Sequence, residues 1–128
     1  MVKHRGGCHC GRVRFEFSAP EVIRVSECNC SVCAKSGYLG LTVPRSRFEL
    51  LAGEDSLSTY TFNTGVAKHL FCRHCGIKSF YVPRSHPTAY NVNVRCLDPG
   101  TIRNMTVKPF NGQEWEKHAS EFVPLDED

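Results

Sequence analysis

The chain has 128 residues and a hydrophobic fraction of 41%, which predicts one globular domain over residues 1–128 with a modest core. The net charge of +3 comes from scattered lysines and arginines, so the concentrated basic patch of a nucleic-acid-binding protein is not expected. No apolar run reaches the length of a membrane span, and the polar start of the chain lacks the apolar region of a signal peptide. These features exclude a membrane protein and predict a cytoplasmic one.

Alternating strand patterns dominate the chain. Residues 12–17 place Val13, Phe15 and Phe17 on one face and charged side chains on the other, which is typical of a half-buried strand. Helical patterns are scarce. A separate prediction is that the side chain of His4 lies at the surface. Further strands are expected at residues 39–43, 48–51, 57–62, 67–71, 78–82, 90–94 and 102–107, with one helical turn at 31–35 and a short C-terminal helix at 112–122. The prediction is a mainly β, antiparallel fold with cysteine knuckles in its turns.

Eight cysteines form three tight clusters and one singleton. An even count permits four disulfides. However, Cys-x-Cys and Cys-x-x-Cys are metal-ligand spacings, and disulfides are rare in the cytosol. Zinc is the metal expected for thiolate-rich sites without redox chemistry. The clusters are Cys8 and Cys10; Cys28, Cys30 and Cys33; and Cys72 and Cys75, and the singleton is Cys96.

The spacing of the clusters predicts two different zinc sites. Two cysteines from each of two distant knuckles can close a tetrahedron, which makes a structural site. A loop that supplies three thiolates leaves one corner of a second tetrahedron for another ligand, and an open corner is typical of a catalytic zinc. We therefore expect two Zn²⁺ per chain.

Three segments together resemble the glutathione-dependent formaldehyde-activating enzyme family, whose domain is shared with centromere protein V. They are Gly6–Phe15, Cys28–Cys33 and Phe71–Gly76. Further stretches resemble the centromere protein V branch in particular, namely Tyr60–Thr64, Cys96–Asp98, Phe110–Gly112 and Trp115–Lys117.

The resemblance implies small twisted β-sheets similar to the zinc-binding fold of methionine sulfoxide reductase B. It implies a structural zinc on Cys8, Cys10, Cys72 and Cys75, and a catalytic zinc on Cys28, Cys30 and Cys33. The implied activity is carbon–sulfur lyase chemistry on glutathione adducts such as S-hydroxymethylglutathione. Two alternatives stay open: a non-catalytic zinc module that binds a partner, and a glutathione carrier without turnover.

The remaining candidates lie outside the three clusters. Cys96 is a candidate fourth ligand of the catalytic zinc, a free thiol beside that site, or a small core residue. His69 is either a base or a core partner, whereas Tyr38 and Tyr81 are expected in the core. The basic residues that could bind glutathione carboxylates are Lys35, Lys68, Arg84 and Arg95.

Overall fold

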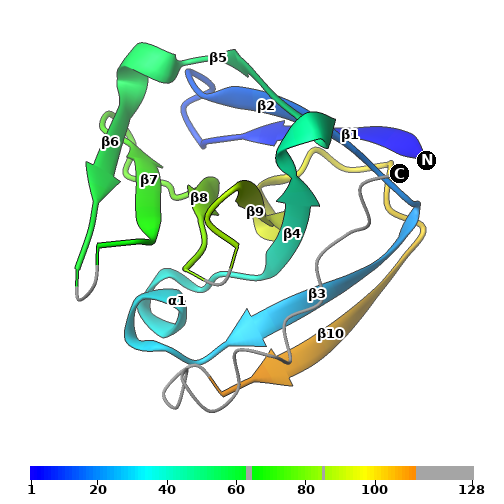
Figure 1. Ribbon diagram of the computed structural model, residues 1–128. Coiled ribbons are helices and arrows are strands. Elements are labelled where there is room, and N and C mark those ends of the chain that lie inside the picture. The colour runs from blue at the N-terminus through cyan, green and yellow to red at the C-terminus, as the bar shows by residue number, and fades with distance from the viewer. Residues whose placement is uncertain (63–64, 85, 112–128) are drawn as a thin grey trace.

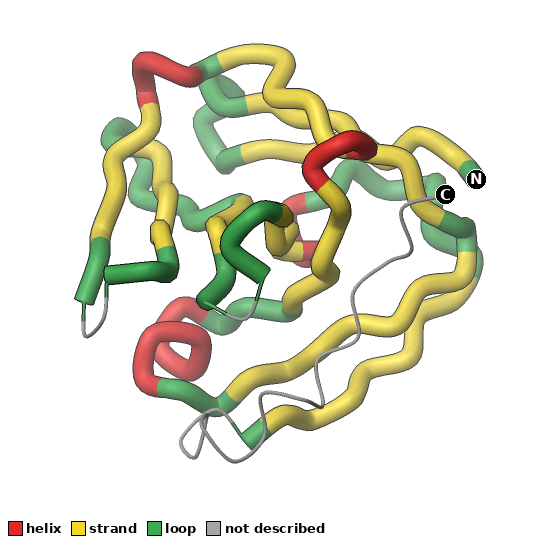
Figure 2. The backbone as a smooth tube through the Cα atoms, viewed as in Figure 1, coloured by secondary structure: helices red, strands yellow, loops and turns green. Residues whose placement is uncertain are grey.

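The computed structural model describes residues 1–62, 65–84 and 86–111, and strands dominate this part of the chain (Figure 2). No helix within these residues is long and apolar enough to span a bilayer. The elements are β1 (Val2–Gly7), β2 (Arg14–Ala19), β3 (Val22–Cys28), α1 (Ser31–Ser36), β4 (Gly40–Pro44), η1 (Arg45–Arg47), β5 (Phe48–Ala52), η2 (Glu54–Ser56), β6 (Leu57–Tyr60), β7 (Lys68–Cys72), β8 (Phe80–Val82), β9 (Ala89–Asn93), η3 (Val94–Cys96) and β10 (Asn104–Phe110).

The strands form two sheets (Figure 1). The smaller has the order β1-β2-β5, and the larger has the order β10-β3-β4-β9-β8-β7-β6. All pairings are antiparallel except that of β10 with β3, which is parallel. The predicted mainly β fold is therefore confirmed, although the sequence analysis missed β1 and β3. The C-terminal helix predicted at 112–122 lies outside the described residues.

An aromatic cluster packs the smaller sheet against the larger. Phe15 lies in β2 and is fully buried, as its alternating pattern predicted. Its ring centroid lies 5.6 Å from that of Phe48 in β5 and 5.9 Å, edge-on, from that of Phe80 in β8. Phe48 also lies 4.4 Å from Tyr90 in β9. Because each fully buried side chain of this size contributes about 1.5–3 kcal/mol, this group fixes how the two sheets meet.

His4 is fully buried, contrary to the surface position that the sequence predicts. Its Nδ1 lies 2.7 Å from the Thr101 hydroxyl, and its Nε2 lies 3.0 Å from the Pro20 carbonyl oxygen. Both ring nitrogens therefore have partners, which removes the main cost of burying the imidazole. The partners lie far along the chain, so the local pattern around His4 could not reveal them.

Candidate metal centres

The first cluster joins the end of β1 to the end of β7. Cys8 and Cys10 follow β1, Cys72 ends β7, and Cys75 lies in the turn after it. All four Sγ atoms lie within 4.8 Å of one another. The Sγ–Sγ distances from Cys10 are 3.6 Å to Cys8 and 3.7 Å to Cys72. Four sulfurs placed 2.3 Å from a tetrahedral zinc would be about 3.8 Å apart, so these residues fit a closed zinc site.

Backbone N–H groups favour thiolates in this first cluster. The N–H of Val13 donates to the Cys8 sulfur at 3.3 Å, and the N–H of His74 donates to the Cys72 sulfur at 3.4 Å. The backbone N–H of Arg12, and then its guanidinium, lower the pKa of Cys10 to about 6. Burial raises the pKa of Cys72 against these contacts, so a bound cation would be needed to deprotonate all four thiols.

The second cluster surrounds the start of α1. Cys28 ends β3, Cys30 is the residue before α1, and Cys33 lies within it. Their three Sγ atoms lie within 4.8 Å of one another, and the N–H of Cys30 faces the Cys28 sulfur at 3.5 Å. Contacts with the side chains of Cys28 and Cys33 lower the pKa of Cys30, while contacts with Cys28, and then with Cys30, raise the pKa of Cys33. The group therefore carries negative charge that a divalent cation would neutralise.

Neighbouring elements hold the second cluster in place. The parallel pairing of β10 with β3 sets Phe110 beside Cys28, and the N–H of Asn29 donates to the Phe110 carbonyl at 3.2 Å. The helix α1 ends at Gly37, whose φ of 62° places it in the left-handed region. Figure 1 shows α1 next to the ends of β3 and β10.

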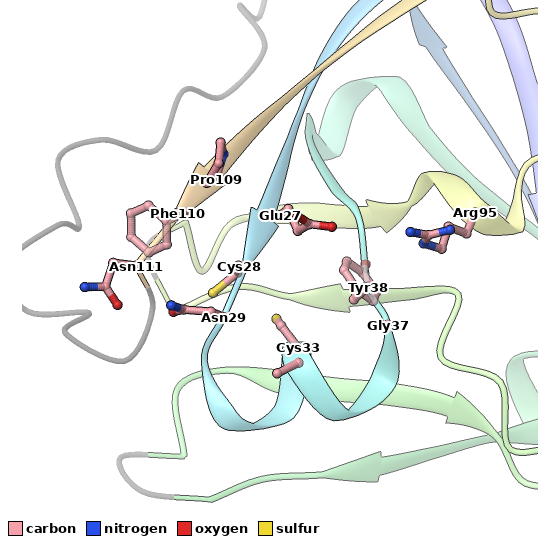
Figure 3. A pocket seen from close by; sticks show the side chains of 11 residues that line it. Glu27, Cys28, Asn29, Cys33, Gly37, Tyr38, Arg95, Pro109, Phe110 and Asn111 are labelled. Carbon is pink, nitrogen blue, oxygen red and sulfur yellow. The ribbon is translucent and has the colours of Figure 1, made fainter.

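A cavity of about 540 Å³ opens at the second cluster (Figure 3). Figure 3 shows the side chains of Cys28 and Cys33 pointing toward each other, with Glu27 and Arg95 extending toward one another on the side of Tyr38. The lining residues are Glu27, Cys28, Asn29, Cys33, Ala34, Gly37, Tyr38, Arg95, Pro109, Phe110 and Asn111. The cavity thus combines thiol sulfurs with a carboxylate, a guanidinium and amides.

Two polar details of the cavity wall limit what it can bind. The hydroxyl of Tyr38 donates to the Asn91 carbonyl at 2.8 Å, so this ring acts as a fixed wall. The side-chain oxygen of Asn111 is buried and has no hydrogen-bond partner among the described residues. A buried acceptor without a partner is costly, so a ligand with an N–H or O–H donor would satisfy it. Of the four basic candidates, Arg95 lines the cavity, whereas Lys35, Lys68 and Arg84 do not.

Cys96 lies in η3 and belongs to neither group of sulfurs within the described residues. Burial raises its pKa to about 11, and negative charge on Cys8 and Cys75 adds to the shift. The segment after it joins β1, since Leu97 bridges Gly6 and the N–H of Asp98 donates to the Arg5 carbonyl at 2.8 Å. The structure therefore does not gather Cys96 with Cys28, Cys30 and Cys33.

The surroundings of the second cluster include residues that the sequence analysis did not assign to it. Tyr38 and Tyr81 pack against Cys33, and the ammonium group of Lys78 lies over both tyrosine rings. His69 contacts Lys78 and stacks on Tyr81. The one sequence signal for this group was His69 on the strand before Cys72, and Lys78 carried no signal beyond its place after the Cys72–Cys75 knuckle.

Comparisons with known proteins found one matching family and a similar solved structure. Residues 3–117 match the sequence model of the family described as glutathione-dependent formaldehyde-activating enzyme. A crystal structure of a Rhodobacter sphaeroides protein superposes with a TM-score of 0.67 at 35% sequence identity. The match covers 80% of this chain and 99% of that protein.

Proposed function

The chain belongs to the glutathione-dependent formaldehyde-activating enzyme family, and from that premise we propose that it is a zinc-dependent carbon–sulfur lyase. Its substrates would be adducts of glutathione or a related thiol, such as S-hydroxymethylglutathione. The observation that carries this proposal is the group of three close cysteine sulfurs at a cavity of about 540 Å³. A cavity of this size is typical of small-molecule sites.

We infer two zinc ions per chain. Cys8, Cys10, Cys72 and Cys75 would hold a structural ion, and Cys28, Cys30 and Cys33 would hold the second. The second zinc, when bound, supplies a positive centre that accepts a thiolate sulfur and stabilises it as a leaving group. In this proposal the substrate sulfur, rather than Cys96, would complete the set of sulfurs begun by Cys28, Cys30 and Cys33.

The cavity wall offers a base for the reaction. In the cleavage direction, the carbon–sulfur bond breaks and its electron pair stays on the sulfur. The hydroxyl group of the adduct loses its proton and becomes the carbonyl group of formaldehyde. Glu27 is the one carboxylate among the described residues that line the cavity, and we assign it to accept this proton. In the reverse direction, Glu27 returns the proton to the new hydroxyl.

Two other residues of the cavity wall suit a charged tripeptide, and Figure 3 shows them on opposite sides of Cys28. Glutathione carries two carboxylates, an ammonium group and two amide N–H groups. Arg95 can bind one of these carboxylates, and the buried oxygen of Asn111 can accept an N–H. These two contacts would orient the thiol toward the cysteine sulfurs.

The proposal extends to location and subfamily. All eight cysteines are free thiols, and thiolate ligands persist in a reducing compartment, which supports a cytoplasmic protein. The stretches Tyr60–Thr64 and Cys96–Asp98 support assignment to the centromere protein V branch.

A partner-binding role is the second candidate, and one observation favours it. Tyr60 and Phe62 are 54% and 40% exposed, and their rings stack with centroids 5.7 Å apart. Exposed aromatic pairs are frequent at protein interfaces. A non-catalytic zinc module would use this surface and would not need the charged cavity.

NMR exchange spectroscopy on a mixture of glutathione and formaldehyde tests the lyase proposal. We expect the protein to accelerate exchange between the adduct and its components, and Cys30→Ser to remove the acceleration while it keeps the fold. The control is zinc salt at the same concentration. A protein that binds glutathione without acceleration would be a carrier, and one that does neither would be a non-catalytic module.

A further inference from the structure

The ammonium group of Lys78 is enclosed by three rings. Its Nζ lies 4.7 Å from the ring centroid of Tyr38 and 4.2 Å from that of Tyr81. It donates a hydrogen bond to Nδ1 of His69 at 2.7 Å. The Lys78 carbonyl in turn accepts from the side-chain amide of Asn93 at 3.2 Å, which fixes the backbone from which the side chain extends. Cation–π contacts of this kind strengthen when they are desolvated.

The rings that hold Lys78 also pack against the second cysteine cluster. Cys33, Tyr38 and Tyr81 form one buried group, against which Cys28 and Cys30 pack. The positive charge of Lys78 therefore lies against the same two rings that pack with Cys33. Burial lowers the pKa of Lys78, whereas negative charge on the three cysteines acts in the opposite direction.

In the hydrogen-bonded pair of His69 and Lys78, the positive charge is on Lys78 and the imidazole is neutral. Its ring stacks on that of Tyr81, with centroids 5.0 Å apart. Burial, and then the charge of Lys78, lower the pKa of His69 to about 4, so the imidazole is a neutral acceptor at neutral pH. Among the described residues no carboxylate forms an ion pair with Lys78. The cysteine sulfurs are thus its nearest identified source of negative charge.

We propose that Lys78 is a positioning residue that makes the second cluster select a negatively charged sulfur ligand over a neutral ligand. The inference rests on the proposed function, because it requires a zinc on Cys28, Cys30 and Cys33 and a substrate sulfur beside it. Three thiolates around a divalent ion already leave one excess negative charge, and a fourth thiolate doubles it. A fixed positive charge held against the rings of this cluster offsets that repulsion and does not act on a neutral ligand.

Cobalt substitution provides the test, because Co²⁺ replaces Zn²⁺ and its visible spectrum reports the fourth ligand. The cobalt protein is titrated with 2-mercaptoethanol, which binds as a thiolate, and separately with neutral imidazole. We expect Lys78→Met to weaken thiolate binding about tenfold or more and to change imidazole binding less than about twofold. Lys78→Arg, which keeps the charge, should stay within about threefold of the parent protein. Lys108→Met, the same change at an exposed position of β10, is the matched control.

Each outcome decides a different point. Equal weakening of both ligands in Lys78→Met, or no weakening of either, would overturn the proposal, since a structural role does not distinguish charge. If Lys78→Met fails to hold the second metal, retention of that metal by Lys78→Arg supports the proposal, and its loss overturns it. A parent protein that binds no thiol contradicts the proposed function as well. A parent that binds thiol with an unchanged Lys78→Met contradicts the inference alone.

Discussion

The two cysteine clusters differ in how far apart in the sequence their cysteines lie. The first cluster brings together Cys10 and Cys72, which are 62 positions apart in the sequence. The second cluster takes all of its sulfurs from residues 28–33 at the start of one helix. A metal in the first cluster therefore closes a long stretch of chain, whereas a metal in the second closes a short loop that β3 and β10 already hold. Because long loops lose more entropy on closure, the first cluster should contribute more to stability.

The surroundings of the two clusters differ in the same direction. The first has four sulfurs and backbone N–H donors, so it could complete the coordination of a metal ion without another ligand. The second has three sulfurs, a cavity with opposite charges, and a half-buried lysine held against the tyrosine rings that pack with Cys33. Coordination complete within the chain favours rigidity, and incomplete coordination beside charged groups favours chemistry. A complete set of sulfurs drawn from distant segments therefore suits a stabilising role. An incomplete set drawn from one segment suits a role in binding or reaction.

The largest expected effect is loss of stability in Cys72→Ser. This variant removes one sulfur from the closed cluster and releases the contact between β1 and β7. We expect the metal content to fall by about one ion per chain and the melting temperature to fall by about 10 °C or more. Elemental analysis and calorimetry measure the two quantities. A variant that keeps both values would show that the first cluster is not a structural metal site.

Cys30→Ser makes the same chemical change in the second cluster. The neighbouring strands and α1 do not depend on this sulfur, so we expect the melting temperature to stay within about 3 °C of the parent. Thiol binding should fall about a hundredfold or more, because the site loses a ligand and its shape. Calorimetric titration with glutathione measures this loss. Equal drops in melting temperature for Cys30→Ser and Cys72→Ser would contradict the division between the clusters.

A smaller effect is expected from Arg95→Met, which removes the guanidinium from the cavity wall. The arginine is exposed, so its attraction for a carboxylate is screened by water. We expect glutathione affinity to fall about three- to tenfold and 2-mercaptoethanol affinity to stay unchanged, because the smaller thiol has no carboxylate. Side-by-side titrations with both thiols check this result. A matched loss for the two thiols would mean that Arg95 shapes the site rather than binds the tripeptide.

Local sequence patterns predicted most of the strands and both groups of cysteines. Alternation placed Phe15 and Phe17 in the core, and knuckle spacing predicted which cysteines the structure brings together. Patterns of this kind report which face of a strand is buried, but not what lies opposite. The parallel partner of β3 and the ring enclosure of Lys78 depend on residues distant in sequence. The surroundings of the second cluster therefore required the tertiary structure.

Cys96→Ser has the smallest expected effect. It tests whether Cys96 belongs to the second cluster. The sequence leaves Cys96 open as a fourth ligand, but the structure puts it in neither group of sulfurs, and the segment after it joins the edge of β1. Its thiol is partly buried and its pKa is raised, so it is a neutral side chain at pH 7 and serine replaces it with little change in volume. We expect unchanged metal content, thiol affinity within about twofold of the parent and a melting temperature lower by about 5 °C at most. If Cys96 were a permanent ligand of the second zinc, its removal would open that site and glutathione would bind more tightly to the variant than to the parent. Tighter binding in the titration would therefore return Cys96 to the second cluster and turn it from an open site into one that is closed at rest.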